Sequence, residues 1–209
     1  MRRLFVLGCG GMGREIACLL EDHPDFGKKW ELKGFLDSKK DTGGFPSKYS
    51  VLNNEDDFQY QEGDLIVLAI ANPETKEHLY QKLHDRVQFF TFVHPSSRVL
   101  DYSMIGEGTV IYPNCFISSN VSIGKLVTIN GGSQIGHDTT IGDYSSLMAH
   151  VDLGGGVVLG NNSFMGTQSA IAPYKKVASY TKISIGSIVM RSISKPGCTL
   201  LGNPAVKFE

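Results

Sequence analysis

The chain has almost no charge bias and no long apolar run. Its 209 residues include 20 Lys and Arg against 21 Asp and Glu, for a formal net charge of −1. This balance gives no electrostatic argument for binding nucleic acid or an anionic membrane. No stretch approaches the roughly 20 apolar residues of a transmembrane helix. The apolar part of the opening MRRLFVLGCGG is too short for a signal peptide. We therefore expect a cytoplasmic protein without membrane insertion.

Cysteine is scarce, and its four positions lie far apart, at Cys9, Cys18, Cys115 and Cys198. Such spacings predict reduced thiols and indicate neither a disulfide framework nor a zinc site. A histidine-based metal site is not expected either, because His137 and His150 are thirteen residues apart. That separation fits neither a repeat of about eighteen residues nor a short spacing on one face.

An aliphatic residue or methionine stands at every sixth position over more than ninety residues. The series is Val99, Ile105, Ile111, Ile117, Ile123, Ile129, Ile135, Ile141, Leu147, Leu153, Leu159, Met165, Ile171, Val177, Ile183 and Val189. A period of six fits neither an α-helix nor a single strand. It predicts a hexapeptide β-helix, in which each face of a coil uses six residues and the aliphatic side chain points into the core. Glycine often follows the aliphatic residue, and we expect it there because glycine tolerates positive φ at the corners.

The first 93 residues follow a different pattern, which predicts a small α/β domain of βαβ type. Buried apolar runs alternate with amphipathic stretches, and His94-Pro95-Ser96-Ser97 is expected to be the hinge into the repeats. The expected strands cover 3–7, 31–36, 64–71 and 87–93, and the expected helices cover 12–22 and 73–86.

A glycine-rich loop separates the first strand from the first helix. Its pattern is Gly8-x-Gly10-Gly11-x-Gly13, which lets a phosphate approach backbone N–H groups at a helix N-terminus. Asp37, at the end of the second strand, is placed to accept hydrogen bonds from a nucleoside, and Asn72 follows a third strand in the same domain. A nucleoside diphosphate fits better than a dinucleotide, because the domain is only half of a full doubly wound fold. The alternative is a tight turn with no ligand.

His137 is the strongest candidate for a catalytic residue. It follows the inward Ile135 and Gly136, so its side chain should face solvent at a corner of the β-helix. A neutral imidazole is a suitable general base for an amine or hydroxyl that attacks a thioester. Asp138 is placed to orient it. His150 is a weaker candidate for the same site.

Several of these motifs, in this order, resemble the NeuD/PglD-type family of bacterial sugar acetyltransferases. The matching segments are Leu7-Gly-Cys-Gly-Gly-Met-Gly13, Gly34-Phe-Leu-Asp37, Ala69-Ile-Ala-Asn72, His94-Pro-Ser96, Ile129-Asn-Gly-Gly-Ser-Gln-Ile-Gly-His-Asp138, Ile185-Gly-Ser187 and Gly202-Asn-Pro-Ala205. The resemblance covers essentially the whole chain.

The resemblance implies a fold in three parts and a trimeric assembly. A small Rossmann-like domain over 1–94 would bind a nucleotide sugar. A left-handed parallel β-helix over 95–194 would bind acetyl-CoA and carry the catalytic residues, and a tail over 195–209 would pack near CoA. The implied reaction is acetyl transfer from acetyl-CoA, without a metal, to a UDP-, GDP- or dTDP-linked 4-amino sugar. The product would enter a bacterial surface glycan.

The resemblance also assigns roles to individual residues. His137 matches the general base, Asp138 its acidic partner and Asn130 a further polar residue of the active site. Gly155 matches a backbone N–H that holds the thioester oxygen. The residues implied in nucleotide-sugar binding are Gly8, Gly10, Gly11, Gly13, Asp37 and Asn72. Those implied in acetyl-CoA binding are Gly155, Gly166, Ile185, Gly186 and Pro204.

Two departures from the family leave the acceptor open. Relatives often carry His where this chain has Met12, and a second His where it has Ser146. Neither loss removes the base. One alternative to N-acetylation is O-acetylation of a hydroxyl, of the sialic-acid or serine type. Another is a non-catalytic trimer with a binding or scaffold role.

Overall fold

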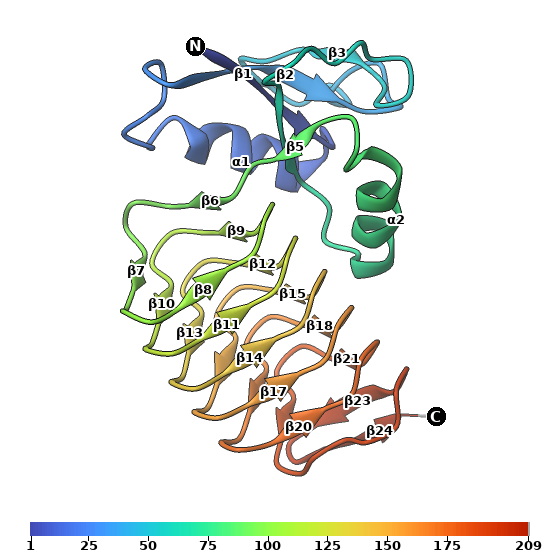
Figure 1. Cartoon of the computed structure of the whole chain (residues 1–209). Coiled ribbons are helices and arrows are strands. Elements are labelled where there is room, and N and C mark those ends of the chain that lie inside the picture. Colours follow the sequence, from blue (N-terminus) through green and yellow to red (C-terminus); the bar gives the residue numbers. More distant parts are fainter. Residues whose placement is uncertain (209) are drawn as a thin grey trace.

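The computed structural model describes residues 1–208 and consists of an α/β domain that sits on one end of a long β-helix (Figure 1). The domain contains a parallel five-stranded sheet with the order β3-β2-β1-β4-β5. Its strands are β1 (Arg2–Leu7), β2 (Trp30–Leu36), β3 (Val51–Asn53), β4 (Leu65–Leu68) and β5 (Gln88–Phe89), and its helices are α1 (Gly11–Leu20) and α2 (Pro73–Leu83).

The sheet lies between the two helices because its central strands are apolar on both sides. Leu4 and Val6 of β1 pack in a core shared with Ile16 of α1. Phe5 and Leu7, which alternate with them, pack in a second core that contains Leu83 of α2. This is the three-layer arrangement that the continuous apolar runs predict. It directs the carboxyl ends of β1, β2 and β4 toward the glycine-rich loop.

Most expected elements of this domain are present, with two differences. The strand β3 was not expected; it is a short edge strand over Val51–Asn53. The single strand expected over 87–93 is wrong, because two strands occupy that segment. β5 pairs with β4 of the domain, whereas β6 (Phe92–Val93) pairs with β9 (Val110–Ile111) of the β-helix. Sheet pairing with the β-helix thus begins two residues before His94.

The repeat region is a β-helix with three parallel sheets, as the six-residue period predicts. Successive strands go to sheets I, II and III in turn, and each pairs with the strand eighteen residues away. Sheet I contains β6, β9, β12 (Thr128–Ile129), β15 (Ser146–Leu147), β18 (Phe164–Met165) and β21 (Lys182–Ile183). Sheet II contains β7 (Arg98–Val99), β10 (Phe116–Ile117), β13 (Gln134–Ile135), β16 (Asp152–Leu153), β19 (Ala170–Ile171) and β22 (Ile188–Val189). Sheet III contains β8 (Met104–Ile105), β11 (Ser122–Ile123), β14 (Thr140–Ile141), β17 (Val158–Leu159) and β20 (Lys176–Val177).

The glycines that follow the aliphatic residues have a different role from the one expected. Positive φ occurs at every sixth residue from Tyr102 to Gly186, three residues after each aliphatic residue, and most of these residues are not glycine. Gly136 and its equivalents are absent from that series. A Cβ on Gly136 would lie 2.5 Å from the backbone nitrogen of Gly155 in the next coil. Glycine is therefore needed for close stacking of coils, not for positive φ.

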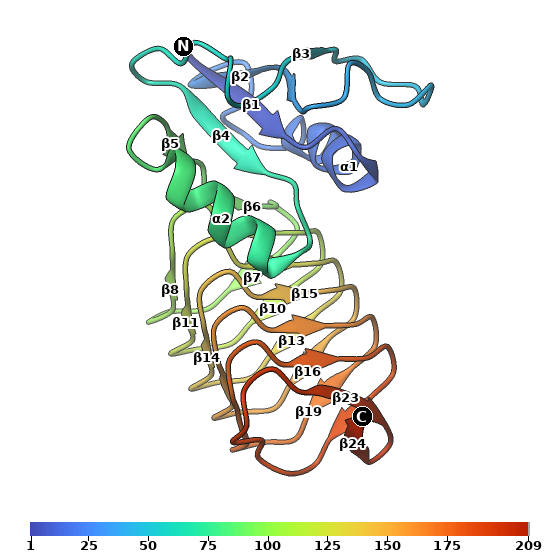
Figure 2. The same cartoon turned by 90° about the vertical axis from the view of Figure 1, so that its right-hand side faces the viewer.

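The α/β domain covers the first coils of sheet I. Figure 2 shows α2 lying alongside these coils, and the outward-facing Thr128 and Ser146 are both buried. Lys76 of α2 is 1% exposed, and its Nζ donates hydrogen bonds to the backbone oxygens of Leu126 at 2.8 Å and Ser145 at 2.9 Å. The two parts of the chain therefore share an extensive contact.

The tail leaves the six-residue pattern, as expected. β23 (Thr199–Gly202) pairs in parallel with β21, and β24 (Ala205–Phe208) folds back on it as an antiparallel strand. This hairpin extends sheet I at the end of the β-helix away from the α/β domain (Figure 1).

Candidate functional site

His137 and Asp138 form a hydrogen-bonded pair where the chain turns from sheet II to sheet III, which we call edge II/III. The Nδ1 atom of His137 lies 2.7 Å from Oδ2 of Asp138, and both side chains are more than half exposed. Asn120, one coil earlier, donates from its Nδ2 to Oδ1 of Asp138 at 2.6 Å. The hydrogen bond from Asn120, followed by the one to His137, lowers the pKa of Asp138. An ionised Asp138 favours the tautomer with the proton on Nδ1, which leaves Nε2 free as a base.

Gly155 lies against this imidazole, eighteen residues further along the chain. A Cβ at position 155 would lie 2.6 Å from Nε2 of His137, so only glycine leaves the ring in its present position. No residue of 1–208 accepts a hydrogen bond from the N–H of Gly155. A donor beside a basic nitrogen is what a developing oxyanion needs during acyl transfer.

The glycine-rich loop contains glycines of two kinds. Gly8 has a φ of 105°, and a Cβ on Gly13 would lie 1.9 Å from the carbonyl oxygen of Gly8, so both are required by the fold. A Cβ on Gly10 would meet nothing within 4 Å, and one on Gly11 would meet only the end of the Arg14 side chain. The fold therefore leaves open space at Gly10, at the N-terminus of α1, where an anion is favoured.

Asp37 closes this loop from the neighbouring strand. Its Oδ2 accepts a hydrogen bond from the Cys9 N–H at 2.8 Å, and its Oδ1 accepts one from the Lys39 N–H at 2.9 Å. These bonds keep its pKa below the ordinary value despite the opposing effect of burial, which is the largest single influence. Gly8, Asp37 and Ile70 line a cavity of about 190 Å³ at the carboxyl ends of β1, β2 and β4.

Asn72 has a structural role that the sequence alone did not reveal. It is the N-cap of α2, and its Oδ1 accepts hydrogen bonds from the backbone N–H of Thr75 at 2.8 Å and from the Thr75 hydroxyl at 3.1 Å. This is ordinary helix capping. Its part in substrate binding stays a prediction.

Within one chain, Asn130 and His137 do not lie in the same cavity. Asn130 lies where the chain turns from sheet I to sheet II, which we call edge I/II, whereas His137 follows the next strand. Asn130 lines a cavity of about 340 Å³ together with His150, Tyr112 and Glu15 of α1. The sequence did not indicate Glu15 or Tyr112 as site residues. Glu15 resembles an ordinary solvent-facing residue of a helix, and Tyr112 resembles an ordinary residue of the six-residue repeat.

The residues implied in acetyl-CoA binding are also divided between edges. Gly166, Ile185 and Gly186 lie on edge I/II, and Gly155 lies on edge II/III. Pro204 lines a cavity of about 490 Å³ at the end of the β-helix, together with Met190 and Arg191. Arg191 follows β22 by two residues, as Gly155 follows β16. It therefore continues the line of His137 and Gly155 down edge II/III.

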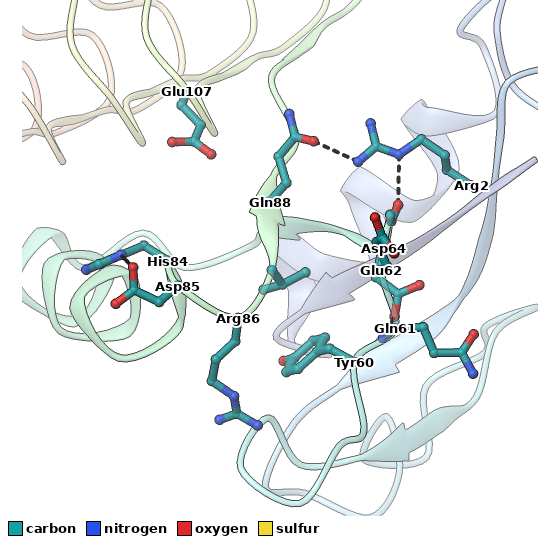
Figure 3. Close-up of a pocket in the computed structure, with 12 residues that line it drawn as sticks. Arg2, Tyr60, Gln61, Glu62, Asp64, His84, Asp85, Arg86, Gln88 and Glu107 are labelled. Carbon is teal, nitrogen blue, oxygen red and sulfur yellow. Dashed lines mark hydrogen bonds and ion pairs between the residues drawn. The ribbon is translucent and has the colours of Figure 1, made fainter.

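A cavity of about 510 Å³ lies away from every predicted site residue, at the amino ends of β1 and β5 (Figure 3). The glycine-rich loop is at the opposite, carboxyl end of the sheet. Arg2 crosses this cavity to donate to Oε1 of Gln88 at 2.7 Å, and the cavity lining mixes acidic and basic groups. Within residues 1–208, no group of three or more His, Cys, Asp or Glu side chains is arranged to hold a metal. In the same range, no helix is both long and apolar enough to cross a membrane.

The fold and these sites define a class of protein: a parallel α/β domain with a phosphate-type glycine loop, joined to a β-helix that presents a His–Asp pair. Residues 3–83 match the family described as the PglD N-terminal domain. The resemblance to the NeuD/PglD type is thereby supported over the α/β domain, where this family match and a curated relative align with the chain.

Known proteins match the chain in sequence over part of its length and in fold over its whole length. The GDP-perosamine N-acetyltransferase of Escherichia coli O157:H7 is 40% identical over 79 residues, which span 37% of this chain and 35% of that protein. The acetyltransferase domain of PglB from Neisseria gonorrhoeae FA1090 shares the fold over 100% of both chains, with a TM-score of 0.90 and 22% identity. A perosamine N-acetyltransferase variant from Caulobacter crescentus, in complex with CoA and GDP-perosamine, has a TM-score of 0.89 and 20% identity over 100% of this chain and 98% of that one. These matches establish a left-handed β-helix as the fold.

Proposed function

We propose that the protein is an acetyl-CoA-dependent N-acetyltransferase that acts on a nucleotide-linked amino sugar. The observation that carries the proposal is the His137–Asp138 pair beside the Gly155 N–H. A base, its orienting carboxylate and an oxyanion donor stand at one point of edge II/III. That set suits attack by an amine on a thioester.

The proposed chemistry is direct transfer. His137 takes the proton from the attacking amine through Nε2 and returns it to the leaving thiolate of CoA. The Gly155 N–H donates to the thioester oxygen as negative charge develops on it. Cys115 is a poor candidate for the nucleophile of a covalent acyl-enzyme. It is buried, and burial raises the pKa of its thiol, which disfavours the reactive thiolate.

The α/β domain is proposed to hold the nucleotide. Its cavity at Gly8 and Asp37 opens beside the N-terminus of α1, where a diphosphate is favoured. The E. coli relative that aligns with this part of the chain is named a GDP-perosamine N-acetyltransferase, which supports a nucleotide-linked 4-amino sugar as the acceptor.

Edge II/III is proposed to hold acetyl-CoA in an extended form. His137, Gly155, Pro173 and Arg191 follow one another at intervals of eighteen residues, one in each coil. Adjacent strands are about 4.8 Å apart, so three steps cover about 14 Å. A pantetheine arm with its thioester at His137 would thus bring the CoA phosphates to Arg191 and the cavity lined by Pro204.

A homotrimer would unite the two edges. Asn130 and His150 share a cavity on edge I/II, and His137 lies on edge II/III of the same chain. Around a threefold axis, one edge of a subunit faces a different edge of its neighbour. We propose that each active site combines His137 of one subunit with the Asn130 cavity of the next, in a cytoplasmic enzyme that serves surface-glycan synthesis.

Thiol release from acetyl-CoA tests the proposal. The acceptors are GDP-perosamine, a UDP-linked 4-amino sugar, their 4-hydroxyl counterparts, sialic acid and serine. Turnover with an amino-sugar nucleotide and an acetyl amide in the product would support N-acetylation. Turnover only with hydroxyl acceptors would establish the O-acetylation alternative. Binding without turnover of any acceptor would favour the scaffold role.

A further inference from the structure

A cavity of about 340 Å³ lies between α1 and edge I/II of the β-helix. Glu15 and Leu19 line it from the helix, and Tyr112, Asn130 and His150 line it from the coils. Figure 1 shows α1 between the sheet and the first coils. The cavity therefore lies at the junction of the α/β domain with the β-helix.

The lining of this cavity carries a negative charge that no basic side chain of the lining balances. Among the described residues that line it, Glu15 is the only acid, and no Lys or Arg accompanies it. Tyr112 is 1% exposed, and its hydroxyl makes no hydrogen bond of ordinary length and angle within residues 1–208. Burial raises the pKa of this hydroxyl, and the nearby carboxylate of Glu15 raises it further, first by its charge and then by a weak hydrogen bond. A neutral O–H donor that lacks a partner is costly to bury unless a ligand completes its bonding.

The cavity also lies within reach of the glycine-rich loop. α1 begins at Gly11, and Glu15 is four residues further along, which is about 6 Å at 1.5 Å per residue. A diphosphate at the N-terminus of α1 would therefore leave the attached sugar ring close to Glu15.

We propose that this cavity receives the amine-bearing part of the acceptor, with Glu15 as the residue that selects an amine over a hydroxyl. The inference rests on the proposed function and specifies its acceptor. A sugar amine is largely an ammonium ion near neutral pH, and a lone carboxylate binds it by a charge-assisted hydrogen bond. The Tyr112 hydroxyl supplies a second polar contact to the ring. The bound ammonium releases one proton to solvent before its nitrogen attacks, and His137 then takes the second proton from that nitrogen and passes it to the leaving thiolate of CoA.

Paired ligands test the selection. GDP-perosamine and its 4-hydroxyl counterpart GDP-rhamnose are titrated against wild type, Glu15→Gln and Tyr112→Phe, with a UDP-linked 4-amino sugar and its hydroxyl counterpart as a second pair. A hydrogen bond to a charged group contributes about 1.5–3 kcal/mol, so Glu15→Gln should weaken amine binding by roughly 10- to 150-fold. The hydroxyl sugars should change less than about threefold, and so should the KM for acetyl-CoA.

The control is Glu62→Gln, an exposed acid beside the cavity of Figure 3, which should leave both ligand pairs unaffected. Tyr112→Phe should weaken both members of a pair about equally while the melting temperature is kept. If Glu15→Gln retains the amine preference of wild type, the inference is wrong even though the enzyme is an amino-sugar acetyltransferase. If wild type acetylates no amino sugar, the proposed function fails, and the inference fails with it.

Discussion

The Nζ atom of Lys76 lies 2.8 Å from the carbonyl oxygen of Leu126, across the junction of the α/β domain with the β-helix. A second carbonyl, that of Ser145, accepts at 2.9 Å, and the Thr128 hydroxyl lies at 3.3 Å. No carboxylate of residues 1–208 pairs with this amine. Burial alone therefore lowers its pKa well below the ordinary value for lysine.

Lys76 should make stability depend on pH. The unfolded chain binds a proton at Lys76 up to the ordinary pKa of about 10.4, whereas the folded chain releases it at a lower pH. Stability should therefore rise with pH between the two pKa values, by up to about 1.4 kcal/mol per unit. Urea unfolding of wild type and Lys76→Met between pH 8 and 10 measures this. The free energy of unfolding of wild type, relative to that of Lys76→Met, should increase as pH rises. Lys40→Met, at an exposed site, should show no such trend relative to wild type. A constant difference would mean that Lys76 keeps its ordinary pKa.

The two kinds of glycine in the loop should respond differently to substitution. Gly13→Ala places a Cβ 1.9 Å from the Gly8 oxygen and should destabilise the protein by about 3 kcal/mol or more. Gly10→Leu should preserve the melting temperature, because its Cβ meets nothing within 4 Å. It should raise the KM for the nucleotide sugar much more than the KM for acetyl-CoA. Equal rises in both constants would indicate that the loop is only structural.

His137→Ala should lower kcat by roughly 10²- to 10⁴-fold, the usual contribution of general-base catalysis. Because the pKa of Asp138 is held below its ordinary value, Asp138 stays ionised throughout the assay range. Asp138 should therefore contribute no titration to the pH–rate profile in that range, and Asp138→Asn should have a smaller effect on kcat than His137→Ala. Near-normal turnover by His137→Ala would transfer the role of base to another residue, with His150→Ala as the next variant.

Gly155→Ala tests the position of the imidazole, because the backbone N–H of residue 155 is kept. The added Cβ would lie 2.6 Å from Nε2 of His137, so the ring must move. We expect kcat to fall by about 10²-fold, the cost of moving a reacting group by about 1 Å, because the backbone N–H remains and the imidazole is displaced. The melting temperature should change little, because position 155 is on an exposed edge. An unchanged kcat would mean that the present position of the His137 ring against residue 155 is not needed for the reaction.

The sequence predicted the β-helix well because each inward residue of a coil is set by one repeating requirement, a buried aliphatic side chain. It misassigned the glycines after those residues, since close stacking of coils and positive φ both favour glycine and only coordinates distinguish them. Lys76 was missed for a related reason. A lysine on an amphipathic helix is expected to face solvent. The neighbouring residues in the sequence do not indicate that backbone carbonyls of the β-helix surround its amine.

The site residues show a similar limit. Asn130 and His137 are seven residues apart, and the family resemblance assigned both to the active site. Because six residues make one face of a coil, seven residues carry the chain to the next edge. Glu15 and Asn130 are far apart in sequence, yet they line one cavity, because α1 packs on edge I/II.

The central claim is that acetyl transfer needs His137 from one subunit and the Asn130 cavity from its neighbour. Co-expression of His137→Ala with Asn130→Ala, carrying different tags, gives mixed trimers that can be isolated and assayed for thiol release. In a threefold ring, every mixed trimer of either composition has one interface of three that combines both intact residues. Isolated mixed trimers should therefore recover about a third of wild-type activity when each variant alone is nearly inactive. Mixed trimers as inactive as their parents would contradict it.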